Sequence, residues 1–241
     1  MRIKDFFGWF LWEGINPVLL NIRSRQKTFD NNFAGLNIGC GLDNPKNWLG
    51  IDGGAYVLLK KIPRPCIKIF YRFTNSSRNY SLDSMLGKIY GSHILHYEIT
   101  RGLPFPDATV PAIFSSHFFE HITKTEAQAL VRECYRVMKN GGIIRICVPS
   151  LEESVKKIEM AVEQYRAGNI SPIQKFVTYD FSGFHNNYSN HRHMYNFTEM
   201  KQLLEEAGFQ HIAEYAFGKG NIPNVEQLDT REGLFVEAVK K

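Results

Sequence analysis

The sequence lacks the features of a disulfide-stabilised or membrane-spanning protein. Its 4 cysteines are scattered and include no CxxC pair, so a disulfide framework is not expected. The apolar run from Phe6 to Trp12 is far shorter than the roughly 20 apolar residues of a spanning helix. Charged residues flank this run and no small-residue cleavage site follows it, so we expect a retained segment. These absences favour a cytoplasmic protein that at most touches a membrane surface.

The sequence also has little net charge. The formal charge is +5 over 241 residues, which is too small to indicate nucleic-acid binding by itself. Apolar residues make up 44% and charged residues 22%, close to globular averages, which excludes disordered and collagen-like classes. The length suits one sizeable core. We expect a single domain over 1–241, with an N-terminal amphipathic helix (1–27), a basic insertion (53–92) and a lid-like insertion (168–196).

Short apolar segments alternate with longer amphipathic ones, which predicts a mainly parallel sheet covered by helices. The expected strands are 36–39, 47–52, 93–98, 112–117, 143–149, 212–217 and 234–239. The expected helices are 123–141, 151–166 and 197–208. Gly141 is the expected C-terminal cap of the first helix, and Thr198 and Gly208 are the expected N-cap and stop of the last.

A glycine-rich turn, "GLNIGCGLDNPKNWLGIDGG", lies between the first two expected strands. In an open parallel sheet, a ligand binds beyond the carboxyl ends of the strands, and glycines there let the backbone approach it closely. A dinucleotide-binding turn would have a third glycine where Asn44 stands, and its acid would follow about 20 residues on. Asp52 comes earlier than that, and no lysine of a phosphate-binding loop is present. The turn therefore predicts a nucleotide-like cofactor but disfavours a pyrophosphate.

Several motifs occur in order: "LNIGCG", "WLGID", "LPFPD", "FSSHFFEHI", "ECYRVMKNGGIIRICVPS" and "HRHMYNFTEMKQLLEEAGF". With them the chain resembles class I S-adenosylmethionine-dependent methyltransferases, in particular the methyltransferase type 11-like branch, most strongly over residues 34–150. The resemblance implies an α/β Rossmann-like fold. In that fold a mainly parallel seven-stranded sheet has helices on both faces and an antiparallel last strand. It also implies S-adenosylmethionine as the cofactor.

The resemblance further implies roles for individual residues. The glycine turn would pass under the methionine part of the cofactor, and Asp52 would accept hydrogen bonds from both ribose hydroxyls. Glu98 stands where an acid binds the adenine amino group, and His117 would lie against the cofactor. Glu120 and His121 would lie near the reacting methyl. The full set of expected cofactor-binding residues is Asn37, Gly39, Cys40, Gly41, Asp52, Glu98 and His117.

Two departures from the family pattern stand out. Asn37 replaces the usual acid before the glycine turn and cannot balance the ammonium charge of the cofactor. Only residues 42–47 separate the turn from the second expected strand, whereas a parallel crossover takes a dozen or more. We therefore expect the usual first helix to be missing or reduced. Either the N-terminal helix covers that flank, or the second strand begins later.

Histidines provide the expected proton acceptors. His121 and His191 are the catalytic candidates, because imidazole titrates near working pH. We expect them on opposite sides of a bound hydroxyl, with the segment that contains Tyr195 folded over the cofactor as a lid. His185 and His193 are alternative bases. His191 and His193 could also ligate a metal, but no cysteine or carboxylate completes a recognised spacing, so no metal is expected.

The basic insertion has no acid between Gly53 and Leu82. Its cations form either a solvated face or an arm that binds an anionic membrane surface or a phosphorylated or lipid-linked substrate. Nucleic acid is disfavoured, because no recognised binding module is present. The leading hypothesis is methyl transfer to an oxygen or nitrogen nucleophile, with a hydroxyl of a saccharide or glycan precursor suggested by family analogy. The alternatives are an RNA or protein methyltransferase and a degenerate cofactor-binding interaction module.

Overall fold

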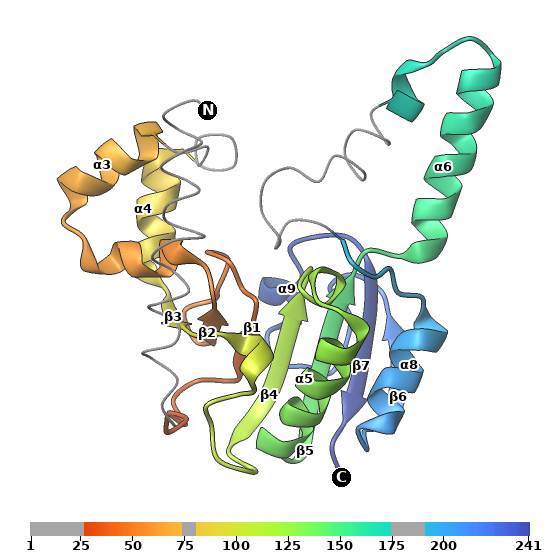
Figure 1. The fold of residues 1–241 in the computed structure, drawn as a ribbon. Coiled ribbons are helices and arrows are strands. Elements are labelled where there is room, and N and C mark those ends of the chain that lie inside the picture. The colour runs from red at the N-terminus through yellow and green to blue at the C-terminus, as the bar shows by residue number, and fades with distance from the viewer. Residues whose placement is uncertain (1–26, 74–80, 175–190) are drawn as a thin grey trace.

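The computed structural model describes residues 27–73, 81–174 and 191–241, which form a seven-stranded sheet of order β3-β2-β1-β4-β5-β7-β6 (Figure 1). The strands are β1 (Leu36–Ile38), β2 (Leu49–Asp52), β3 (His93–His96), β4 (Val110–Ser116), β5 (Met138–Val148), β6 (Gln210–Tyr215) and β7 (Leu234–Val239). The first five strands pair in parallel, and β7 runs antiparallel between β5 and β6. This arrangement confirms the expected fold class.

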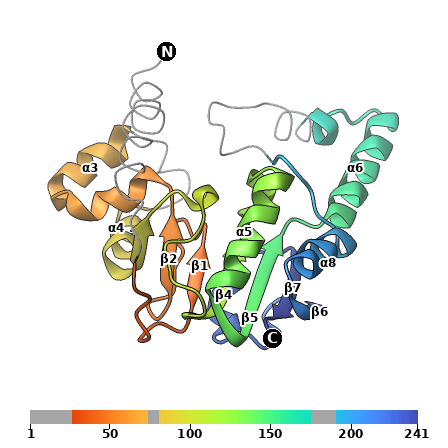
Figure 2. The same cartoon turned by 60° about the horizontal axis from the view of Figure 1, so that its bottom comes forward.

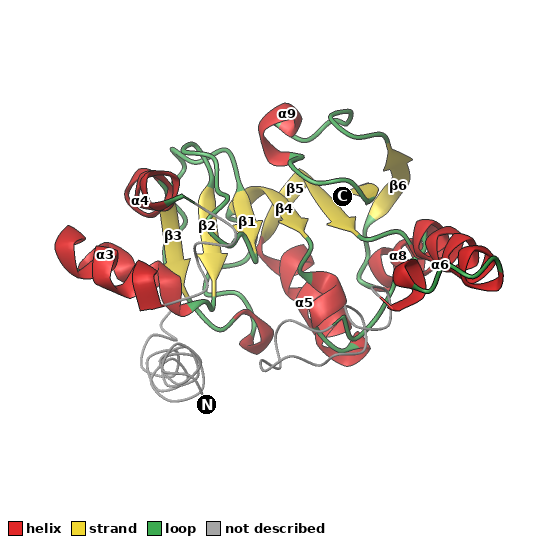
Figure 3. Ribbon diagram, turned by 90° about the horizontal axis from the view of Figure 1, so that it is seen from above, coloured by secondary structure: helices red, strands yellow, loops and turns green. Residues whose placement is uncertain are grey.

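Helices cover both faces of the sheet, as the parallel strands require. The α-helices of the described residues include α3 (Arg64–Phe73), α4 (Leu82–Gly91), α5 (Lys124–Val137), α6 (Leu151–Arg166), α8 (Phe197–Glu206) and α9 (Val225–Leu228). Three short 3-10 helices are η2 (Ala55–Lys61), η4 (Ile99–Arg101) and η5 (Phe119–His121). Figure 3 shows α5 and α8 on one side of the sheet and α9 on the other. Figure 2 shows α3 and α6 rising on either side of the edge where the parallel strands end.

Alternation along β4 divides the core between the two faces. Ile113 belongs to the main cluster, which includes Leu130 and Val131 of α5. Phe114 points to the opposite side and packs in a smaller cluster with Trp48 and Leu228. Successive side chains of a strand point to opposite faces, so one strand supplies both clusters. The two cores fix the position of the carboxyl end of β4, where the functional residues begin.

The connection from β1 to β2 lacks the usual crossover helix, as expected. None of residues 39–48 is helical, and β2 begins at Leu49, two residues later than predicted. Trp48 is fully buried against Ile222 and Leu228, so the C-terminal segment covers this flank. Its indole N–H donates to Asn224 Oδ1 at 3.4 Å. The predicted N-terminal helix lies almost entirely outside the described residues.

Two predicted helix boundaries are wrong. α5 ends at Val137, because Met138 already pairs with Val110 of β4. Gly141 lies where the β4–β5 register shifts, and its φ of +79° suits the bulge of a strand rather than a helix cap. The N-cap of α8 is Asn196, not Thr198, since the Asn196 side chain accepts from Glu199 N at 2.8 Å. Gly208 does end α8, with a φ of +102°.

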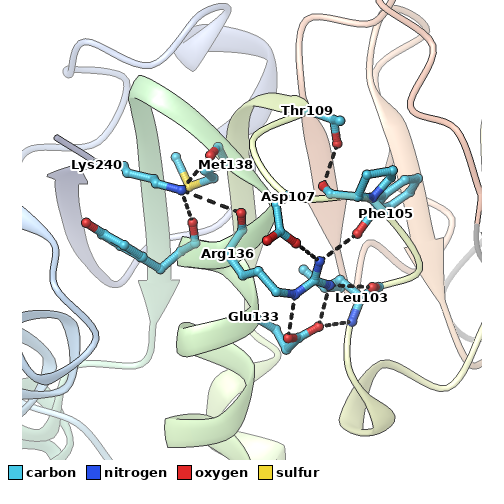
Figure 4. A network of polar contacts seen from close by, with 10 residues as sticks. Leu103, Phe105, Asp107, Thr109, Glu133, Arg136, Met138 and Lys240 are labelled. Atoms are coloured by element: carbon cyan, nitrogen blue, oxygen red, sulfur yellow. Dashed lines mark hydrogen bonds and ion pairs between the residues drawn. The ribbon is translucent and has the colours of Figure 1, made fainter.

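The "LPFPD" motif is fastened to α5 by one arginine (Figure 4). Arg136 donates to the backbone oxygens of Leu103 at 3.0 Å and Phe105 at 2.9 Å. It also forms ion pairs with Glu133 and Asp107. Glu133 in turn accepts from Leu103 N at 2.9 Å, and the Arg136 hydrogen bond lowers the pKa of Glu133. The network holds the segment between β3 and β4 in place and so fixes both neighbouring strand ends.

The basic insertion folds as a small unit at the β3 edge. Its η2, α3 and α4 enclose a second core of Leu42, Leu59, Ile67, Met85 and Ile89. Ile67 is fully buried, while Lys60, Lys61, Arg64 and Lys68 lie on the surface. Among the described helices of the chain, none is long and apolar enough to cross a membrane.

Candidate functional site

The glycine turn after β1 has the backbone geometry that only glycine adopts readily. Gly39 has a φ of +65° and Gly41 a φ of +58°. A Cβ on Gly39 would lie 2.4 Å from the ring of Phe118, so the turn is pressed against the loop that follows β4. A Cβ on Gly41 would meet only the Tyr56 hydroxyl, at 3.9 Å. The turn thus contacts the β4 side of the site closely and leaves its own tip open for a ligand.

Asp52, at the end of β2, is fixed by two backbone donors. Its Oδ2 accepts from Gly41 N at 2.9 Å, and its Oδ1 accepts from Gly54 N at 2.7 Å. Burial raises the pKa of Asp52, and hydrogen bonds from Tyr56, Gly41 and Gly54 oppose that shift. The two carboxylate oxygens offer about four lone-pair sites, so these three hydrogen bonds leave one site for a ligand hydroxyl, and displacement of the Tyr56 hydroxyl would leave a second. The binding of both ribose hydroxyls by Asp52 stays a prediction.

Glu98 lies close to Asp52, at the end of the neighbouring strand. The Tyr97 N–H donates to the Asp52 backbone oxygen at 3.1 Å, which fixes the two strand ends side by side. Glu98 is the N-cap of η4, where its Oε1 accepts from the Thr100 hydroxyl at 2.9 Å. Its negative charge contributes to the raised pKa of Asp52. The structure therefore brings together the acids predicted for the ribose and the adenine.

Asn37 and Cys40 line the inner side of the turn. The Asn37 amide donates to Asp43 O at 3.3 Å and to Asn44 Oδ1 at 3.1 Å, so it braces the turn between β1 and β2. The Cys40 thiol is buried, and burial together with Asp52 raises its pKa well above the ordinary value. Both residues support the shape of the turn, and their direct contact with the cofactor stays a prediction.

His117 begins the loop after β4 with a φ of +52°, which is unusual for a residue with a side chain. Its Nε2 lies 3.2 Å from the backbone oxygen of Glu232, and its Nδ1 lies 3.2 Å from Glu120 Oε1. The His117 N–H donates to Cys147 O at 2.9 Å, which ties the loop to β5. The imidazole of His117 therefore lies between the backbone oxygen of Glu232, just before β7, and the carboxylate of Glu120.

His121 and His191, the predicted catalytic pair, lie together. Their ring centroids are 5.1 Å apart with the planes at 67°. Rings in such contact leave no room for a hydroxyl between them, so the expectation that they lie on opposite sides of an acceptor is wrong. An acceptor oxygen must instead bind beside the pair.

Backbone hydrogen bonds explain how two distant segments bring these rings together. The Arg192 N–H donates to Glu120 O at 2.6 Å, and the His193 N–H approaches the same oxygen at 3.3 Å. Tyr195 then forms a parallel bridge to Ser150 at the start of α6. The segment from 191 to 195 is thereby held against η5, while most of the predicted lid-like insertion (168–196) lies outside the described residues.

The other histidines and Tyr195 are placed differently. His193 Nε2 lies 3.4 Å from Glu199 Oε1, which directs it away from the pair. The Tyr195 ring packs on His193, and burial, with Glu199 and Glu120, raises the pKa of Tyr195 to about 12. His185 lies outside the described residues. His193 and Tyr195 therefore have supporting positions.

Sequence reasoning missed two contacts that shape the site. Phe118 packs on Gly39, and Glu232 supplies a backbone oxygen to His117. Gly39 in the turn indicated that another group approaches the backbone closely. The sequence did not show that this group is Phe118, which follows a different strand, β4. No sequence pattern could have identified Glu232, because its contact depends on where β7 enters the sheet.

Comparison with known proteins agrees with this geometry. The family model described as "Methyltransferase domain" matches residues 36–146. A second, described as "ubiE/COQ5 methyltransferase family", matches residues 95–225, more than half of the chain. The sheet, the glycine turn and these matches define the chain as a class I S-adenosylmethionine-dependent methyltransferase. Within that class it belongs to the ubiE/COQ5 methyltransferase family, and its cofactor is S-adenosylmethionine.

Individual relatives are more distant. A protein of Mycolicibacterium smegmatis named "Probable S-adenosylmethionine-dependent methyltransferase" is 28% identical over 131 residues, covering 54% of this chain and 40% of that protein. A methyltransferase structure from Archaeoglobus fulgidus shares 15% identity, covers 98% of this chain and 99% of its own, and has a TM-score of 0.43. Haemonchus contortus phosphoethanolamine N-methyltransferase 2, with bound S-adenosyl-L-methionine, shares 14% identity, with coverages of 100% and 60% and a TM-score of 0.45.

Proposed function

We propose that this protein transfers the methyl group of S-adenosylmethionine to an oxygen or nitrogen nucleophile, a hydroxyl of a saccharide or glycan precursor being the acceptor we favour. The observation that supports it best is the contact between Gly39 and Phe118. This contact supports the proposal because it joins the glycine turn, whose Gly41 N–H donates to Asp52, to the loop that bears His121. A methyl donor bound over the glycine turn would thus face the imidazole pair.

The chemistry makes few demands on the protein. The sulfonium methyl is already activated, so the site must mainly align the acceptor for in-line attack and let its proton leave. The bond from sulfur to the methyl carbon breaks as the new bond to oxygen forms, and the sulfur leaves as a neutral thioether. The cluster of His121, His191 and Glu120 supports this role, because it gathers basic groups where the acceptor would bind.

The choice of a saccharide acceptor rests on family analogy. Methylation of RNA or protein is the rival, and the basic insertion would serve it. Two of the described cations of that insertion have internal contacts: Lys60 Nζ donates to Ser92 O at 3.0 Å, and Arg64 stacks over Tyr90. These contacts weaken the rival, although Lys61 and Lys68 still face the surface and could contact a phosphorylated or lipid-linked acceptor.

A degenerate cofactor-binding module is the other alternative. The fixed Asp52 carboxylate disfavours it, because an aspartate held by two backbone donors with acceptor capacity left over suits a working ribose site.

The test begins with methyl-labelled S-adenosylmethionine and a panel of saccharides, RNA and protein acceptors. With the best acceptor, we expect His121→Ala or His191→Ala to lower turnover by about 100-fold or more, the usual scale for lost proton transfer. Binding of S-adenosylhomocysteine should change little. His211→Ala, remote from the site, is the matched control. Cofactor binding without transfer to any acceptor would favour the degenerate module, and near-normal turnover of both variants would remove the pair from catalysis.

A further inference from the structure

The carboxylate of Glu120 is buried and has no hydrogen-bond partner among the described residues. It is fully inaccessible to solvent, and neither Oε1 nor Oε2 accepts a hydrogen bond from any described residue. A buried acid is normally held by donors or paired with a cation, because leaving an ionised group unpaired away from water is very unfavourable. The position of Glu120 therefore calls for a positive charge next to it.

The nearest candidate, His117, does not supply that charge in its neutral form. Its Nδ1 lies 3.2 Å from Glu120 Oε1, but its Nε2 lies 3.2 Å from the backbone oxygen of Glu232. A carbonyl oxygen only accepts, so Nε2 bears the hydrogen and Nδ1 presents a lone pair to the carboxylate. A neutral His117 thus leaves the charge of Glu120 uncompensated. His121, whose Nε2 lies 3.8 Å from the same Oε1, compensates that charge only if it is protonated.

Two other imidazoles complete a cluster around this carboxylate. One ligand atom each from Glu120, His121 and His191 lie within 4.8 Å of one another. One carboxylate and two imidazoles are a donor set that suits divalent transition metals such as Zn²⁺ and Fe²⁺. Ligands about 2.1 Å from one tetrahedral ion lie roughly 3.4 Å apart, so only a small closure is needed. His191 is exposed, which leaves an open side for water or substrate.

We propose that Glu120, His121 and His191 bind one divalent transition metal ion beside the cofactor site. The backbone prepares the cluster, since the oxygen of Glu120 accepts from Arg192 N at 2.6 Å and so holds the His191 segment against η5. From the sequence no metal is expected, because no cysteine or carboxylate completes a recognised spacing with His191 and His193. In the structure the carboxylate comes from η5, and His193 is directed to Glu199 instead.

The role of this ion rests on the proposed methyl transfer. An acceptor hydroxyl bound to the ion through its oxygen loses its proton more easily, as water does on bound zinc. The proton goes to solvent, and the oxygen then takes the methyl from the sulfonium without any change in the oxidation state of the metal. In this scheme His121 and His191 promote loss of the proton through the ion that they hold, so their alanine variants should still lose turnover as the proposed function expects.

The test uses the metal alone and needs no acceptor. Tag-free protein stripped with EDTA is titrated with Co²⁺ by absorption spectroscopy and with Zn²⁺ by calorimetry. We expect one ion per chain and the absorption bands of a coordinated Co²⁺. His191→Ala, at an exposed position, should weaken binding at least 10-fold without threatening the fold, and Glu120→Gln should do the same. His211→Ala should bind like the wild type.

Three results would overturn the proposal. They are no stoichiometric binding, binding that both site variants retain, and loss of binding in His211→Ala to the same degree. In those cases a protonated imidazole would be the partner of Glu120. Binding of S-adenosylhomocysteine to the stripped protein is measured alongside. If it persists while metal binding fails, the metal site falls and the cofactor site stands, and the labelled-methyl assay with acceptors decides the proposed methyl transfer separately.

Discussion

Two carboxylates in neighbouring parts of the site, those of Asp52 and Glu120, have opposite hydrogen-bonding environments. Asp52 accepts one backbone N–H on each oxygen, from Gly41 and Gly54. Glu120 is more deeply buried, and neither of its carboxylate oxygens accepts a hydrogen bond from the described residues. Both lie beyond the carboxyl ends of parallel strands, where ligands of such sheets bind.

The difference separates two kinds of ligand. A carboxylate fixed by backbone donors keeps its orientation and uses its remaining lone pairs for the hydroxyls of a neutral sugar. A buried carboxylate without donors favours a cation, because only a nearby positive charge offsets its loss of hydration. The difference is consistent with our proposals, in which Asp52 binds the cofactor and Glu120 takes part in the chemistry of the acceptor.

The largest effect expected on cofactor affinity comes from Asp52→Ala. It should weaken binding of S-adenosylhomocysteine by about 2–4 kcal/mol, since two charge-assisted hydrogen bonds to the ribose are lost. Isothermal titration calorimetry measures this directly. Glu120→Gln is the matched variant and should leave that affinity near the wild-type value. If both variants lost the same affinity for S-adenosylhomocysteine, the proposed difference in role between Asp52 and Glu120 would be wrong.

A smaller effect is expected from Glu98→Gln. The amide keeps one acceptor oxygen for the adenine amino group and for the Thr100 hydroxyl, so the loss should be about 1 kcal/mol. The same calorimetric titration gives the value. A loss as large as that of Asp52→Ala would show that the charge of Glu98 is needed, and no loss would place the adenine elsewhere.

The sequence predicted most of the framework. Apolar periodicity located all seven strands, and the helix 151–166 matches α6 at both ends. The short link between Gly41 and Leu49 correctly predicted a missing crossover helix, because its length leaves no alternative in a parallel pair. The boundaries that failed, at Gly141 and Thr198, depend on strand pairing and on a competing cap, Asn196, which local propensity does not resolve.

The site was less predictable than the fold. Residues at strand ends, such as Asp52 and Glu98, could be placed because parallel strands end at one edge. The sequence predicted that His121 and His191 lie in the same site. The prediction that they lie on opposite sides of a bound hydroxyl was wrong, because their rings are in contact. The sequence predicted that Glu120 lies near the reacting methyl. It did not predict that the carboxylate is buried without a hydrogen-bond donor from the described residues. Such an environment is a property of packing and has no sequence spacing to reveal it.

The subtlest test of the comparison concerns the protonation of Asp52. Burial raises its folded-state pKa above the ordinary value of an aspartate, while ribose hydroxyls bind the ionised form. Affinity for S-adenosylhomocysteine should therefore be full at neutral pH and fall as the pH drops through that raised pKa. The fall should begin at a higher pH than an exposed aspartate would give.

Calorimetry in two buffers of different ionisation enthalpy measures the protons released on binding, and so tests independently whether the ligand favours the ionised form of Asp52. Binding favours the charged carboxylate, so it lowers the pKa of Asp52 and releases protons on the acid side of neutrality. Asp52→Asn has no titrating group there and should release none at this step, whatever affinity it keeps. Glu120→Gln should release protons like the wild type, because its carboxylate does not contact the cofactor in our assignment. Proton release that follows Glu120 and not Asp52 would reverse the roles of the two acids.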